Sequence, residues 1–171
     1  SAVALDASHN VTVGGTAVTL TGGSAQAQVE TINTTIPAYL SQLDGIASTL
    51  ASSVNTIHQT GYDLNGAAGG AFFSGTTAAT ITVAITDPSQ VAASATGAGT
   101  ADLDASVAQK LAALGSSKTG ADAAYSNMVS TVGSDSARAT QQSTIQASVT
   151  SSVDNLQQQA SGVSYADEVT N

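Results

Sequence analysis

Histidine is the residue type whose chemistry would say most about this chain, and the chain has 2 of them, His9 and His58. A zinc or iron site needs several nitrogen, oxygen or sulfur ligands that converge on one point. The sequence has no His-x-x-x-His pair and no cluster of carboxylates that could complete such a site. Ser is so abundant that a Ser-His-Asp set arises by chance, and no Gly-x-Ser-x-Gly turn marks a nucleophile. We therefore expect His58 to serve capping or packing.

Three other motifs could suggest ligand chemistry, and each of them is incomplete. The run Gly115-Ser-Ser-Lys-Thr119 is similar to a phosphate loop, but Ser stands where a Gly must precede the Lys and no strand leads in. Asp102 and Asp104 have the spacing that opens a calcium loop, yet the later Gly and Glu are missing, so a role at the positive end of a helix explains them better. Asn10 and Asn33 each begin a glycosylation sequon, which arises easily in a Thr-rich chain. The sequence therefore predicts no enzyme, no cofactor and no metal.

The charge balance excludes several classes of partner. The 171 residues carry a net charge of -9, and Lys110, Lys118 and Arg138 are the only basic side chains. Nucleic-acid binding depends on Lys and Arg that displace phosphate counterions, so a nucleic-acid partner is excluded and anionic membranes are disfavoured. No apolar run is long enough to cross a bilayer, and without Cys there is no disulfide or thiol chemistry. No cleaved-signal pattern follows Ser1, and we interpret the chain as a fragment of a longer protein.

Two segments are predicted to be long helices with an apolar stripe. Residues 24 to about 59, with Ser24 as the N-cap, place apolar residues three and four positions apart, which is the spacing of a coiled coil. Pro37 has no amide proton, so this helix should either kink there or restart with Pro37 in its first turn. Residues 119–163 follow the same step with polar interruptions. The predicted packing seam consists of Ile36, Leu40, Leu43, Leu50, Val54 and Ile57 on the first helix and of Tyr125, Val132, Val149, Val153 and Leu156 on the second.

The remaining segments are predicted to be short elements. Residues 1–23 alternate apolar and hydroxyl side chains around a Gly-Gly pair, which indicates a β-hairpin. Residues 61–100 form a Gly-, Thr- and Ala-rich excursion with a strand candidate at 80–85, and we expect Phe72 and Phe73 to anchor it on the helices. A short helix should follow at 103–114, with Gly115 as its C-cap. The predicted fold class is mainly α within α+β, with long antiparallel coiled-coil-like helices and small β-hairpins.

One ordered string of residues resembles a known family. The stretch from Ile32 to Ala47, Ile-Asn-Thr-Thr-Ile-Pro-Ala-Tyr-Leu-Ser-Gln-Leu-Asp-Gly-Ile-Ala, strongly resembles the flagellar hook-associated protein 1 family, the first hook–filament junction protein. The likeness continues at the family's spacing through Val54-Asn55, His58, Gly61-Tyr-Asp-Leu-Asn-Gly66 and Phe72-Phe73. Shorter matches lie at Asp87 to Ser94, at Ser161-Gly-Val163 and at Asp167-Glu168, so the resemblance covers roughly residues 24–168.

The resemblance implies a structural subunit of the bacterial flagellum at the junction between hook and filament. It implies a flagellin-like axial core domain at residues 24–171, preceded at residues 1–23 by the end of a variable outer domain. It also implies export through the flagellar type III channel and an extracellular location in the flagellum. The implied partners are other copies of the chain, the hook protein and the next hook-associated protein.

A secreted adhesin or surface-binding module is an alternative from a different class. Its loop at residues 61–73 would present Tyr62, Phe72 and Phe73 to a ligand. A concave pocket lined by these rings would favour the adhesin, whereas burial of Phe72 and Phe73 against the helices would favour the junction protein. A fragment of a soluble enzyme is a third alternative.

Overall fold

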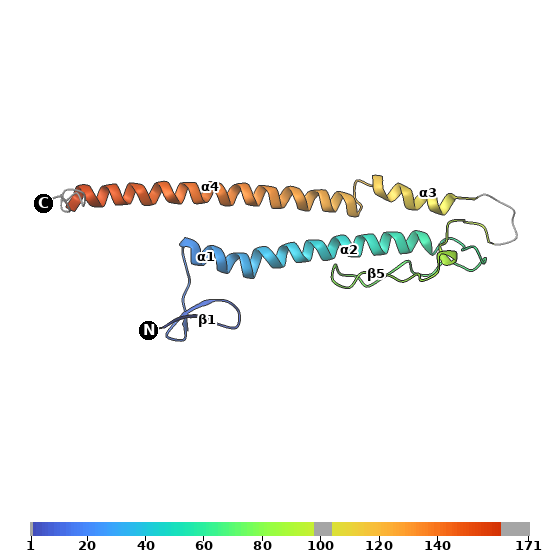
Figure 1. Cartoon of the computed structure of the whole chain (residues 1–171), viewed down its shortest axis with the longest axis horizontal. Helices are drawn as coiled ribbons and strands as arrows, with labels where there is room; N and C mark the ends of the chain where they lie inside the picture. The colour runs from blue at the N-terminus through green and yellow to red at the C-terminus, as the bar shows by residue number, and fades with distance from the viewer. Residues whose placement is uncertain (1, 98–103, 162–171) are drawn as a thin grey trace. The chain divides into compact units, whose positions relative to one another are not determined.

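The computed structural model describes residues 2–97 and 104–161 (Figure 1). The chain divides into two compact units, residues 1–128 and residues 129–171. Both long helices of the mainly α, α+β class are present, together with small antiparallel strand pairs, so the predicted fold class is confirmed. The antiparallel packing of the two long helices stays a prediction, as does the division into an outer segment and a core domain. Leu103, Val163 and the Asp167-Glu168 pair lie outside the described residues.

The first unit opens with a three-stranded antiparallel sheet. Its strands are β1 (Val3–Leu5), β2 (Val11–Val13) and β3 (Thr16–Ala17), in that order across the sheet. Gly14 and Gly15 form the turn between β2 and β3 with φ values of 60° and 83°, a conformation that Gly adopts without steric cost. The predicted hairpin is therefore present, with one further strand.

The first long helical segment is continuous from Gly23 to His58. It comprises α1 (Gly23–Glu30), a π-helical turn η1 (Thr31–Thr35) and α2 (Ile36–His58). Pro37 is the second residue of α2, so of the two expected alternatives the chain has Pro37 in a first turn without leaving the helix. The wide π turn directly before it relieves the steric and hydrogen-bonding conflict that a proline creates with the preceding turn. The prediction of Ser24 as N-cap is wrong, because the helix already begins at Gly23, whose φ of +85° makes the bend.

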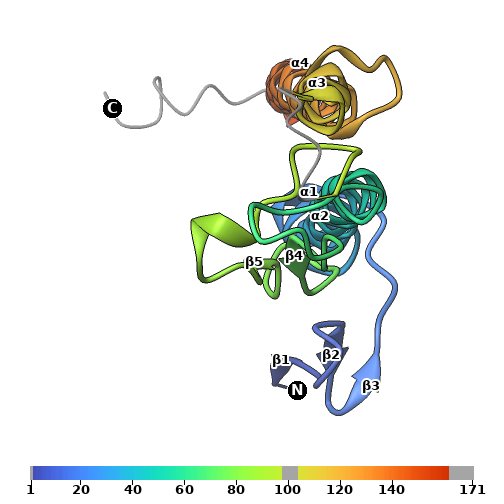
Figure 2. The same cartoon turned by 90° about the vertical axis from the view of Figure 1, so that its right-hand side faces the viewer.

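The excursion after α2 folds back along that helix (Figures 1 and 2). It contains the strand pair β4 (Phe73–Ser74) and β5 (Thr82–Val83) and the 3-10 turn η2 (Pro88–Gln90). The strand predicted at 80–85 is thus two residues long. It starts only at Thr82 because the Thr77 carbonyl oxygen accepts hydrogen bonds from the amides of Thr80 and Ile81, which keep the chain in a turn up to that point.

Two further helices complete the described chain. The short helix α3 (Ser106–Ala113) continues into the 3-10 turn η3 (Leu114–Ser116). The prediction of Gly115 as its C-cap is therefore wrong, because Gly115 lies inside η3. The helix starts at Ser106, later than predicted. The Asp104 carboxylate accepts hydrogen bonds from the amides of Ser106 and Ala95, and these bonds hold residue 104 outside the helix. The second long helix, α4 (Ala121–Ser161), begins two residues after the predicted start, and its predicted end at 163 lies outside the described residues.

Candidate functional site

Asn55 fastens the excursion to α2 through the backbone of two phenylalanines. Its Oδ1 accepts hydrogen bonds from the amides of Phe72 and Phe73, both at 2.8 Å, and its Nδ2 donates to the carbonyl oxygen of Phe73 at 2.9 Å. A side-chain amide offers an acceptor and two donors, so this geometry uses both ends of the group. The strand β4 therefore begins at a point fixed by α2.

His58, one turn further along α2, makes a second attachment. Its ring is completely buried, with 0% of its surface exposed. Nδ1 lies 2.9 Å from the carbonyl oxygen of Gly70, and Nε2 lies 2.8 Å from the amide nitrogen of Ala92. Because the carbonyl can only accept and the amide can only donate, the ring must be neutral with its proton on Nδ1. Both ring nitrogens are therefore occupied by backbone partners of the same chain.

Close backbone approach around His58 depends on two glycines. A Cβ at Gly69 would overlap the carbonyl oxygen of His58, and a Cβ at Gly61 would lie 2.9 Å from the carbonyl oxygen of Ser94. The adjoining side chains Ala92 and Val107 are both 0% exposed. We name the set Asn55, Gly61, Gly69, Ala92 and His58 the α2 clamp. It is a closely packed structural centre.

Phe72 and Phe73 lie beside this clamp. The Phe72 ring meets the His58 ring edge to face at a centroid distance of 5.4 Å, and the two Phe rings are 4.9 Å apart. Both phenylalanines are half-buried, whereas Tyr62 is 37% exposed. Their position against α2 favours the anchoring role over presentation to a ligand. The anchoring role itself stays a prediction until it is measured.

Three aspartates shape the loops of the same unit. Asp63 Oδ1 accepts the amides of Asn65 and Ala67 at 2.8 Å, which makes a tight turn. Asp87 accepts the amide of Ser89, and this hydrogen bond lowers the pKa of its carboxyl group. The backbone amides of Ser106 and Ala95 lower the pKa of Asp104 to about 2. The sequence interpretation of Asp104 as a helix-start residue is thereby extended, because it also holds the end of the excursion.

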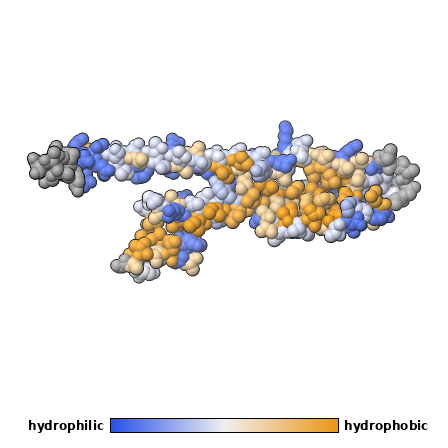
Figure 3. Space-filling view, in the orientation of Figure 1, coloured by the Kyte–Doolittle hydropathy of each residue, from blue (hydrophilic) through white to orange (hydrophobic). Residues whose placement is uncertain are grey.

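The predicted seam residues are placed in two separate units. On α2, Leu43, Val54 and Ile57 are half-buried, while Ile36, Leu40 and Leu50 are 47%, 56% and 38% exposed. On α4, the exposed fractions are 58% for Tyr125, 39% for Val132, 50% for Val149, 55% for Val153 and 64% for Leu156. Figure 3 shows apolar surface along the helical run of the first unit. Each unit by itself thus leaves large aliphatic side chains of the predicted seam exposed.

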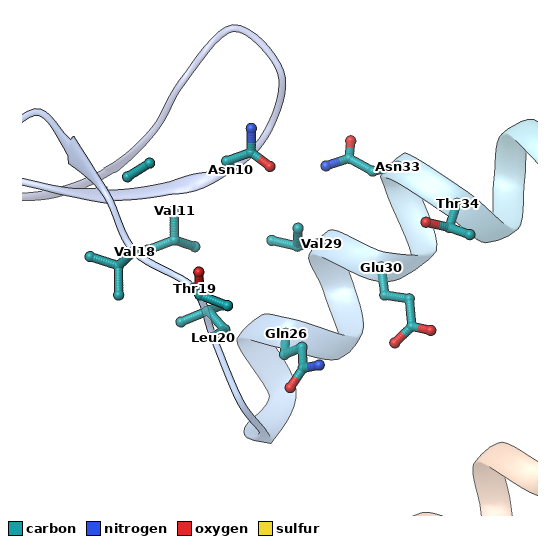
Figure 4. A pocket seen from close by; sticks show the side chains of 11 residues that line it. Asn10, Val11, Val18, Thr19, Leu20, Gln26, Val29, Glu30, Asn33 and Thr34 are labelled. Carbon is teal, nitrogen blue, oxygen red and sulfur yellow. The ribbon is translucent and has the colours of Figure 1, made fainter.

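The first unit has a cavity near its first sheet and another between α2 and α3. The larger, about 570 Å³, lies between the first sheet and the start of the helical run, where Asn10, Val18, Val29 and Asn33 line it (Figure 4). The smaller, about 190 Å³, is a groove between α2 and α3, lined by Leu50, Val54, Leu111 and Leu114 among others. Neither is lined by Tyr62, Phe72 or Phe73.

Within residues 2–97 and 104–161, His, Asp and Glu side chains form no group of three or more that could hold a metal ion. His9 is exposed in the turn between β1 and β2 with a φ of 60°. None of the helices in the described chain has both the length and the apolar character that a membrane span requires.

Sequence reasoning did not single out Asn55 as a site residue, although a signal was available. Asn55 and His58 are three positions apart and directly follow the seam positions Val54 and Ile57, so both lie beside the apolar stripe of the helix. Buried polar side chains are hydrogen-bonded in native structures, and here the partners had to come from the following loop. The backbone groups that they bind could not be read from the sequence.

Comparison with protein families bears on residues 1–73, which match the model described as the flagellar hook-associated protein FlgK helical domain. The matched range includes the first sheet, the helical run from α1 to α2, Asn55, His58 and the start of β4. It confirms the family resemblance for this part of the chain. Searches of curated proteins and of solved structures found no match.

Proposed function

We propose that this chain, similar over residues 1–73 to the FlgK helical domain, belongs to a structural subunit that joins hook and filament in the bacterial flagellum. The match to a flagellar hook-associated protein is the observation that carries the proposal. The proposed partners are other copies of the chain, the hook protein and the next hook-associated protein. The proposed location is extracellular, after export through the flagellar channel, and no enzymatic role is proposed.

The chemistry of the α2 clamp supports a structural role. The polar atoms of Asn55 and the two ring nitrogens of His58 are engaged with backbone groups of the same chain. Such a centre fixes the path of the excursion on the helix, and it leaves no free acid, base or nucleophile at the site.

The exposed seam residues support assembly with further helices. Each large aliphatic side chain that stays exposed forfeits about 1.5–3 kcal/mol of burial. Every described residue of α4 beyond Met128 is exposed apart from the half-buried Asp135, and an isolated helix is marginal in water even with good helix formers. We propose that the stripe of Val149, Val153 and Leu156 is covered in the assembled flagellum, and that Ile36 and Leu40 are covered in the same way.

The experiment that tests this proposal is done in the source bacterium with the complete gene. Deletion should leave hooks without attached filaments in electron micrographs, because the proposed junction is missing. Leu40→Asp in the complete protein should reproduce the defect, since it places a charge in the proposed interface. Ser41→Asp, a change at the neighbouring exposed position, is the matched control and should preserve filaments.

Normal filaments after deletion would reject the junction role. Loss of surface attachment with intact filaments would instead support the adhesin alternative.

A further inference from the structure

One asparagine of the chain is followed by glycine, and this pair, Asn65-Gly66, lies in the turn after α2. An asparagine loses its side-chain amide when the main-chain nitrogen of the next residue attacks it, and a following Gly leaves that nitrogen sterically open. The other asparagines of the described chain precede a β-branched residue, which crowds the nitrogen, or lie within α4; they are Asn10, Asn33 and Asn55 in the first class and Asn127 and Asn155 in the second. The sequence therefore marks Asn65 as the reactive position.

The side chain of Asn65 is open to the reaction. Asn65 is exposed, so water reaches its amide group. Its Nδ2 donates one long hydrogen bond of 3.4 Å to Ser89 Oγ, which is a weak restraint. The group that would be attacked is thus accessible and loosely held.

The attacking nitrogen, in contrast, is held by the turn. The Gly66 amide donates to the carbonyl oxygen of Asp63 at 3.1 Å. The carboxylate of the same aspartate accepts the amides of Asn65 and Ala67, both at 2.8 Å, and the Asp63 amide donates to the carbonyl oxygen of Ala67 at 2.9 Å. The Gly66 nitrogen must leave this hydrogen bond and turn towards the Asn65 side chain before it reacts. We name the backbone and carboxylate bonds that Asp63 makes to residues 65–67 the Asp63 turn.

We propose that Asn65 is a site of spontaneous deamidation whose rate is set by opening of the Asp63 turn. In the open turn the Gly66 nitrogen attacks Cγ of Asn65, and a bond from that nitrogen to Cγ forms. The bond from Cγ to Nδ2 breaks, and ammonia leaves with the proton that Gly66 has lost. Water then opens the cyclic imide at one of its two carbonyl carbons, which gives aspartate or isoaspartate at position 65. This reactivity belongs to the chain itself and does not depend on the proposed flagellar role.

The product should be unable to close the turn again. Isoaspartate carries the main chain through its side-chain carbon, so an extra methylene group separates residues 65 and 66. Either product also adds a carboxylate two positions from Asp63. The Leu64 amide, which donates to the carbonyl oxygen of Ser89 at 3.1 Å, should therefore lose its protection from hydrogen exchange in the modified chain.

Incubation of the whole chain in mildly alkaline buffer, followed by peptide mapping with mass spectrometry, measures the reaction. Asn, Asp and isoaspartate at position 65 are quantified over time in the folded chain and in the chain unfolded by urea. The folded chain should react at least about tenfold more slowly than the unfolded chain, because the closed turn occupies the nucleophile. Asn65→Gln keeps a side-chain amide but requires a larger ring, and it should abolish the reaction at this position.

Asp63→Ala tests the role of the turn. It removes the acceptor of two amides and should raise the rate of deamidation in the folded chain roughly tenfold, since hydrogen bonds to a carboxylate favour the closed turn. Asp6→Ala is the matched control, because Asp6 makes the same kind of turn in the first sheet by accepting the amides of Ser8 and Asn10. The control should leave the rate at Asn65 unchanged. Circular dichroism establishes that both variants keep their helices.

A second measurement needs no variant. In urea below the unfolding transition, deamidation at Asn65 and hydrogen exchange of the Gly66 amide should accelerate in parallel, because both require the open turn. An unreactive Asn65 in the unfolded chain would overturn the assignment of the site. Equal rates in the folded and unfolded chains, a folded Asp63→Ala chain with the wild-type rate, or divergence of deamidation from Gly66 exchange would overturn control by the Asp63 turn.

Discussion

Replacement of Asn55 by Ala should release the excursion from α2 without disturbing the helix itself. Ala is a good helix former, so α2 should persist. The change leaves three backbone groups without their partner: the amides of Phe72 and Phe73 and the carbonyl of Phe73. The expected loss is therefore local to the start of β4 and to the loop that precedes it.

The magnitude follows from the number and burial of these groups. A buried polar group left without a partner costs about 1–3 kcal/mol. Asn55 and its three bonds are half-buried, so water recovers part of the loss, and we expect about 2–4 kcal/mol in the free energy of unfolding. For a chain of this length this corresponds to a fall of roughly 5–15 °C in the melting temperature.

Two measurements check this expectation. Urea unfolding gives the stability change, and amide hydrogen exchange at Phe72 and Phe73 reports local opening directly. Asn65→Ala is the matched control, because Asn65 is exposed and its side chain donates one long hydrogen bond of 3.4 Å to Ser89. The control should stay within about 0.5 kcal/mol of the wild type. Equal stability of the two variants, with the Phe72 and Phe73 amides still protected in Asn55→Ala, would refute the reasoning.

Three other substitutions probe the surroundings of this attachment. His58→Phe keeps a ring beside Phe72 but leaves the Gly70 carbonyl and the Ala92 amide without partners in a buried site, and urea unfolding should show a loss of roughly 2–4 kcal/mol. Gly69→Ala should lower the melting temperature strongly, because its Cβ would overlap the His58 carbonyl, whereas Gly70→Ala, with open space at its Cβ, should not. The pKa of Asp104 is about 2 in the folded chain, against an ordinary value of 3.8. Its carboxylate therefore stabilises the fold at pH values above 3.8, and this contribution is lost as the pH falls towards 2. Asp104→Asn should therefore be less stable at neutral pH and should lose less stability than the wild type between about pH 5 and pH 2 in urea midpoints; parallel pH profiles would contradict the assignment.

Helical periodicity placed the long elements correctly from the sequence because it depends on neighbours three and four positions away. The apolar steps from Ile36 to Ile57 indicated a helix there, and the predicted start of α4 was close for the same reason. Local chemistry at the ends was less decisive. The first helix begins at Gly23, so Ser24 is not its N-cap. The helix α3 begins later than predicted because Asp104 accepts a hydrogen bond from the amide of Ala95, nine residues earlier in the chain.

The sequence by itself determined the fold class, the lack of basic surface and the family resemblance, since each of these depends on composition or on an ordered string of residue types. Only the tertiary structure decided which groups the side chains of this string of residues contact. Asn55 and His58 bind the backbone of Gly70, Phe72, Phe73 and Ala92, and these partners come from as many as 34 positions further along the chain. A backbone amide or carbonyl is present at almost every position, so residue types carry no information about which one a side chain will meet. That choice was made by the path of the excursion over α2, where Gly69 permits the closest approach.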